Sequence, residues 1–206
     1  VEIISGQPFS EFLGERIFEP LDMSDTSFTI SDEKVPRLAA NYERDQDKNL
    51  VLIDDPVESI YANTRRLQSG GGGLLSTTAD YAKFCEMLLE GGKYNGCRII
   101  GDRTLKMMCQ NHLPMNADLA SVAMGSFSET AYEGVGFGLG FASTLNEVNA
   151  HIIGEGDLYW GGMASTIFWV DPRERMFCVF MTQLVPSGTF NFRGQLKSIV
   201  YSSIED

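Results

Sequence analysis

Apolar residues recur at helical spacing in three segments of the chain, so three amphipathic helices are expected. Each stripe would form the buried face of its helix. The three stripes are Phe9, Phe12, Leu13 and Ile17; then Tyr81, Phe84, Cys85, Leu88 and Leu89; and finally Phe192, Leu196, Ile199 and Val200.

Glycine and capping residues set the expected helix boundaries. Residues 1–4 resemble the end of a helix stopped by Ser5-Gly6, and Pro8 suits the first turn of the next helix. Thr77 and Asp80 have the spacing of an N-terminal capping pair, so Ser76 and Thr77 are interpreted as caps and not as nucleophiles. Asp102 is expected to cap a further helix that runs to Met108.

The hydrophobic period changes to that of strands after Tyr132. Gly134 to Gly140 alternate with apolar residues, which predicts a glycine-rich strand. Two apolar runs, 167–170 and 176–183, are joined by a polar turn and predict a hairpin with both faces covered. The polar residues 41–49 indicate a surface turn or hairpin. The sequence therefore predicts an α+β or layered α/β domain, with an antiparallel sheet flanked by helices.

The run 159–172 is expected to be a buried strand with adjacent glycines at Gly161 and Gly162. Glycine inside a strand often marks a bulge, or a place where a ligand approaches bare backbone. Trp160 beside them could equally be a core aromatic. The four glycines 70–73 could be only a loop.

Composition excludes several classes of function. The formal net charge of −12 argues against nucleic acid and anionic membranes as partners. Four cysteines lack the close spacing of a zinc site, and His112 and His151 stand alone, so no metal is expected. Cys85 and Cys178 are interpreted as buried apolar residues. The cysteine pattern leans toward a reducing, cytoplasmic compartment.

Several segments, in this order, resemble the serine β-lactamase-like superfamily, in its class C β-lactamase and family VIII carboxylesterase branch. They cover most of the chain, and their order is more specific than any one of them. The matching segments are residues 5–9, 17–23, 70–84, 94–100 and 160–172.

The resemblance implies a transpeptidase-like fold and a site on the last of these segments. Trp160-Gly161-Gly162 is similar to the family's Lys/His/Trp-x-Gly strand motif, and the N–H of Met163 would then be one oxyanion donor. Gly71, Gly72 and Gly73 would line one wall of the cleft. Penicillin-directed relatives carry lysine where this chain has Trp160, which favours neutral acyl esters over β-lactams.

The family's nucleophile motif, Ser-x-x-Lys, and its Tyr-x-Asn motif lie upstream of the matched segments. Ser31 to Lys34 and Tyr61 to Asn63 have these letters but stand in the wrong place, so neither is expected to be catalytic. Residues 1–206 are therefore interpreted as the C-terminal portion of a single catalytic domain.

The complete protein is expected to be a serine carboxylesterase that forms an acyl-enzyme with a small ester or amide substrate and uses no cofactor. A β-lactamase or D-amino-acid peptidase, and a non-catalytic scaffold relative, remain open. The missing segment could also be a separate polypeptide. Residues 1–206 alone should be inactive, and they should self-associate, retain an upstream piece, or be disordered near Val1 and at 70–73.

Overall fold

The computed structural model describes residues 1–62, 67–122 and 132–205. Its α-helices are α1 (Glu2–Ser5), α2 (Phe9–Leu13), α3 (Thr78–Leu89), α4 (Asp102–Met108), α5 (Leu119–Val122), α6 (Glu147–Ala150) and α7 (Phe192–Tyr201). A π-helix continues α2 over Gly14–Phe18, and three 3₁₀ turns lie at Val35–Arg37, Ile60–Ala62 and Pro114–Asn116. In the described segments no helix is long and apolar enough to cross a bilayer.

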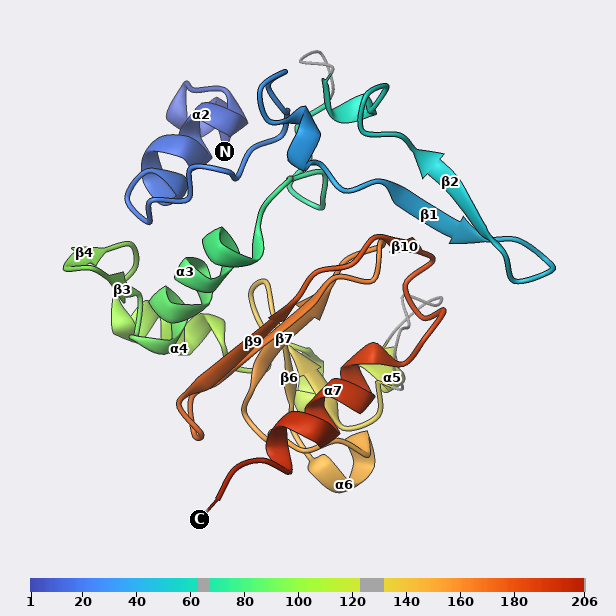
Figure 1. The fold of residues 1–206 in the computed structure, drawn as a ribbon. Helices are drawn as coiled ribbons and strands as arrows, with labels where there is room; N and C mark the ends of the chain where they lie inside the picture. Colours follow the sequence, from blue (N-terminus) through green and yellow to red (C-terminus); the bar gives the residue numbers. More distant parts are fainter. Residues whose placement is uncertain (63–66, 123–131, 206) are drawn as a thin grey trace.

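The strands form a five-stranded antiparallel sheet, a three-stranded sheet and a short hairpin. The large sheet has the order β5-β6-β7-β8-β9, and β10-β1-β2 make the three-stranded sheet (Figure 1). The strands are β1 (Asn41–Arg44), β2 (Leu50–Asp54), β3 (Lys93–Tyr94), β4 (Cys97–Arg98), β5 (Val135–Phe137), β6 (Ala142–Thr144), β7 (Leu158–Gly161), β8 (Ile167–Asp171), β9 (Met176–Phe180) and β10 (Leu184–Val185). The mixed α+β fold and the β1–β2 hairpin expected from residues 41–49 are confirmed.

Helices cover both faces of the large sheet, so its central strands are buried. On one face Phe168 and Val170 pack with residues of α3 and α4. On the other face Ile167 and Trp169 pack against residues of α7. All five residues of β8 are buried, whereas those of β9 at the sheet's end are half-buried. The predicted hairpin of two apolar strands is confirmed, but full coverage holds only for its first strand.

The helix caps follow the sequence in part. Gly6 adopts the left-handed conformation after α1, and the Thr77 hydroxyl accepts a hydrogen bond from the Asp80 N–H at 3.1 Å. The predictions for Ser76 and Asp102 are wrong. The Ser76 hydroxyl shares a hydrogen bond with Thr26, and the N-cap of α4 is Gly101, so Asp102 is already helical.

The face of α7 differs from the expected apolar stripe. Ile199 is 66% exposed, while Arg193 and Lys197 are buried. The Lys197 ammonium pairs with Asp157 and donates to the Ile153 carbonyl at 3.1 Å. Asp157 also accepts the Thr144 N–H at 3.0 Å. The helix therefore docks on the sheet partly through a buried ion pair.

Candidate functional site

The Trp-Gly-Gly segment lies at the end of β7, where the chain turns into β8. Register pairs Trp160 with Phe168 and Gly161 with Ile167. The Gly162 N–H then donates to the Thr166 carbonyl at 2.7 Å, which closes the turn. A Cβ on Gly162 would lie 2.3 Å from the Thr166 hydroxyl, so a side chain here would force the Thr166 side chain to move.

Met163 follows Gly162 at the tip of this turn. Met163 is 74% exposed. Within residues 1–62, 67–122 and 132–205, no acceptor takes a hydrogen bond from the Met163 N–H. The backbone at this point is therefore open to a ligand oxygen, as an oxyanion donor must be.

Trp160 is half-buried and has both structural and surface roles. Its ring meets Phe137 of β5 edge-on, with ring centroids 5.0 Å apart and an interplanar angle of 78°. Such a contact fixes the indole in place, and the role of Trp160 as an apolar wall of the cleft stays a prediction.

Gly71, Gly72 and Gly73 lie between the 3₁₀ turn at 60–62 and α3. Gly71 and Gly72 are exposed. No hydrogen bond or strand pairing among the described residues links them to the 162–166 turn. Their role in the cleft stays a prediction that depends on the family resemblance.

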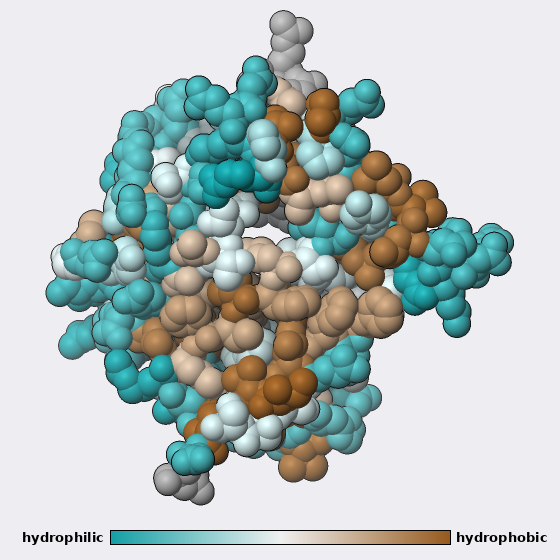
Figure 2. Space-filling view, in the orientation of Figure 1, coloured by the Kyte–Doolittle hydropathy of each residue, from teal (hydrophilic) through white to brown (hydrophobic). Residues whose placement is uncertain are grey.

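At least two hollows are found on the described part of the chain. The larger, with a volume of about 500 Å³, is lined by α2, the Gly14–Phe18 π-helix and the loop 22–29, with Gln68 at its edge. Neither hollow is lined by residues 71–73. Figure 2 also shows an opening in the molecule, with apolar side chains gathered beside it. On one side of this opening lie α2 and the three-stranded sheet, and on the other side lies the five-stranded sheet.

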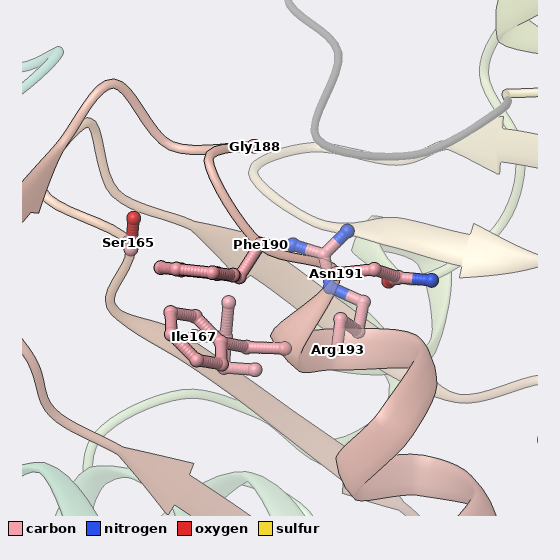
Figure 3. Close-up of a pocket in the computed structure, with 7 residues that line it drawn as sticks. Ser165, Ile167, Gly188, Phe190, Asn191 and Arg193 are labelled. Carbon is pink, nitrogen blue, oxygen red and sulfur yellow. The ribbon is translucent and has the colours of Figure 1, made fainter. Parts of the chain in front are cut away.

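The smaller hollow lies directly beside the turn, but it is too narrow to admit a water molecule. Ser165 and Ile167 line it together with residues 188–193. Figure 3 shows Ser165 and Arg193 at opposite ends of this pocket, with Phe190 between them. The turn reaches the surface at Met163, which is 74% exposed, but the crevice next to it has no room for a ligand.

The Ser31–Lys34 pair lacks the geometry of a nucleophile and its base. Lys34 forms an ion pair with Asp25 at 2.9 Å and donates to the Ser24 carbonyl at 2.7 Å. Its ammonium is therefore engaged away from the Ser31 hydroxyl. Tyr61 lies in a 3₁₀ turn, and Asn63 lies outside the described residues.

The histidines and cysteines have surface or packing positions. His112 and His151 are exposed, and the His112 ring lies 2.8 Å from the Met107 carbonyl. Cys85 is fully buried, and burial raises its thiol pKa to about 12. Cys178 is half-buried. The described residues contain no group of three His, Cys, Asp or Glu side chains placed to hold a metal.

Sequence reasoning missed Ser165. Its side chain is 2% exposed, its φ is +66°, and its hydroxyl donates to the Leu184 carbonyl at 2.6 Å. No local signal identifies it, because a serine in a turn is common and Leu184 is far along the chain.

Comparison with known proteins identifies similar sequences and structures. The family model described as Beta-lactamase matches residues 1–198. The lovastatin esterase of Penicillium rubens is 30% identical over 86% of this chain and 45% of its own length. Protein Rv1367c of Mycobacterium tuberculosis is 26% identical over 90% of this chain and 46% of its own.

Solved structures give the same picture. EstCE1, described as a hydrolase with promiscuous acyltransferase activity, has a TM-score of 0.76 at 25% identity and covers 97% of this chain and 52% of its own. Simvastatin synthase (LovD) from Aspergillus terreus has a TM-score of 0.80 at 20% identity, over 100% of this chain and 52% of its own. The chain spans about half the length of the proteins that it matches. The family match, with the fold and the ordered motifs, shows that the chain belongs to the Beta-lactamase family.

Proposed function

We propose that the protein containing this chain is a serine carboxylesterase that works through an acyl-enzyme, without a metal or cofactor. The observation that carries the proposal is the N–H of the exposed residue Met163, which has no acceptor among the described residues and directly follows Trp160-Gly161-Gly162. In an acyl transfer, such a donor would bind the oxygen that becomes negative as the carbonyl carbon turns tetrahedral.

The surroundings of the turn favour a neutral ester as substrate. Trp160 adds an apolar wall where a lysine would attract a substrate carboxylate. The similarity to lovastatin esterase and to the hydrolase EstCE1 supports the same class of reaction. Gly71 to Gly73 would form a second wall of the cleft, where missing side chains leave room for the acyl group.

The nucleophile belongs to sequence upstream of Val1, or to a separate polypeptide. The matched proteins are about twice as long as this chain. Residues 1–206 would then be the C-terminal portion of one catalytic domain, which supplies the oxyanion turn while the rest supplies Ser-x-x-Lys and Tyr-x-Asn.

The test compares two substitutions of Met163 in the longer protein, with p-nitrophenyl butyrate and a cephalosporin as substrates. Met163→Pro removes the N–H, and Met163→Ala, the matched control, keeps it. Losing one oxyanion donor lowers kcat by about 10²- to 10³-fold. We therefore expect that loss for proline and near-normal kcat for alanine.

Four results would contradict the proposal. Equal kcat for the proline and alanine variants would remove Met163 from the oxyanion site. Faster turnover of the cephalosporin than of the ester would indicate a β-lactamase, and no turnover of either would indicate a scaffold. Ester hydrolysis by residues 1–206 alone, lost on Ser31→Ala, would show that the nucleophile lies in this chain.

A further inference from the structure

Ser165 holds an unusual backbone conformation in the turn that follows Gly162. Its φ of +66° lies in the left-handed region, where residues with a Cβ are uncommon. The residue is nevertheless 2% exposed, so the strained conformation is fixed by its surroundings. Its N–H also donates to the Gly162 carbonyl at 3.0 Å, which tightens the turn around Met163.

Two hydrogen bonds tie the turn to β10. The Ser165 hydroxyl donates to the Leu184 carbonyl at 2.6 Å, and the Leu184 N–H donates to the Ala164 carbonyl at 3.1 Å. Leu184 is itself 8% exposed and pairs with Tyr42 of β1. Both the N–H and the carbonyl of Leu184 are therefore hydrogen-bonded to the turn that follows β7, and these two bonds tie the turn to the three-stranded sheet.

The Ser165 hydroxyl is turned away from the pocket beside it. In Figure 3 its oxygen points away from the Phe190 ring. With its proton committed to the buried Leu184 carbonyl, this hydroxyl is not placed to act as a nucleophile. Its contacts are those of an anchor.

We infer that Ser165 is a positioning residue that fixes the Met163 N–H at the oxyanion site. This inference rests on the proposed function. An oxyanion donor acts only when it is held about 2.7–3.1 Å from the developing charge. A shift of about 1 Å can cost about 100-fold in rate. Ser165 is two residues from Met163, and its hydroxyl bond is the side-chain contact that ties this part of the turn to β10.

The experiment replaces Ser165 by alanine and by glycine in the longer protein. Glycine accepts positive φ without strain, so Ser165→Gly removes the hydroxyl while it permits the native backbone. Ser198→Ala is the matched control, because it deletes another hydroxyl that donates to a carbonyl, that of Gly194 at 2.8 Å, on the exposed side of α7.

Three quantities are measured: kcat per titrated active site, KM for p-nitrophenyl butyrate, and the hydrogen-exchange rate of the Leu184 amide. We expect both Ser165 variants to lose about 10- to 100-fold in kcat, with KM within about twofold of the wild-type value. The Leu184 amide should exchange at least about tenfold faster, because its partner carbonyl at Ala164 loses its anchor. Ser198→Ala should change none of the three.

The outcomes separate this inference from the function on which it depends. An active wild-type enzyme with unchanged kcat in both Ser165 variants would overturn the positioning role alone. Unchanged Leu184 exchange would overturn the clamp. A smaller number of titratable sites with normal kcat per site would assign Ser165 to folding only. Wild-type protein without esterase activity would end the proposed function, and the positioning role with it.

Discussion

Replacing Lys197 by methionine should strongly destabilise the protein, because it would leave the Asp157 carboxylate unpaired in the interior. Lys197 is 1% exposed and Asp157 is fully buried. Without the ammonium, the hydrogen bond from the Thr144 N–H at 3.0 Å would be the main remaining partner of Asp157. Breaking one side of a buried ion pair costs about 3–5 kcal/mol.

The loss of unfolding free energy in Lys197→Met should be smaller at low pH than at neutral pH. Burial raises the pKa of Asp157, and the ion pair with Lys197 lowers it. Burial has the larger effect, so the pKa lies above its usual value. In Lys197→Met the ion pair is lost, and burial, the largest cause of the shift, is opposed only by the Thr144 hydrogen bond, so the folded pKa of Asp157 would exceed its unfolded value of about 4. A group with a raised folded pKa stabilises fully below its unfolded pKa and loses that contribution as pH rises. The variant should therefore be less destabilised at pH 4 than at pH 7.

The assay is urea unfolding at pH 4 and pH 7, followed by tryptophan fluorescence. Trp169 is a suitable reporter, because its ring lies 5.9 Å from the Lys197 ammonium and is fully buried. The control is Lys106→Met, which breaks the exposed pair with Asp102 at 2.9 Å and should cost at most about 1 kcal/mol.

A double variant, Lys197→Met with Asp157→Leu, removes both charges and should recover most of the loss. If Lys197→Met costs no more than Lys106→Met, or if the double variant is as unstable as the single one, the ion pair does not hold α7 on the sheet.

Three further predictions concern other parts of the fold. Thr77→Ala should cost about 1 kcal/mol of unfolding free energy in urea, since it removes the α3 cap, whereas Thr78→Ala at an exposed position should stay within about 0.5 kcal/mol; equal losses would contradict the cap. With Ellman's reagent at pH 8, the exposed Cys97 should react first and the buried Cys85, with its pKa raised to about 12, only on unfolding, so a fast phase that survives Cys97→Ser would refute this order. Hydrogen bonds from two basic side chains lower the pKa of Asp25, so its contribution to stability should be present above about pH 4 and fall as pH drops further, and Asp25→Asn should flatten acid unfolding curves; identical curves would show that the carboxylate contributes nothing.

Features with local causes were predictable from the sequence. The cap at Thr77 and the stop at Gly6 depend on residues within one turn of the helix end. The β8–β9 hairpin follows from two apolar runs around a polar turn. In each case the physical cause lies within a few residues, so a pattern along the chain can represent it.

The face of α7 was not predictable in this way. A stripe with Ile199 is the better apolar pattern, yet the structure exposes Ile199 and buries Arg193 and Lys197. Arg193 lies 4.6 Å above the Tyr159 ring, and Lys197 reaches Asp157, 40 residues earlier in the chain. A partner so distant in sequence leaves no periodic trace, so hydrophobicity alone favours the wrong side of the helix.

The candidate site also combines a local sequence motif with a contact between residues far apart in the chain. The sequence predicts one buried strand over 159–172, and this is wrong, because a turn at 162–166 separates β7 from β8. The letters Trp160-Gly161-Gly162 do not determine where the next N–H points. The anchor that we propose for that direction is Ser165, which bonds to Leu184, 19 residues later. A relative with the same three letters but without this anchor would present the donor with no fixed direction. An oxyanion turn is therefore better recognised by the contact that holds it than by the glycines that permit it.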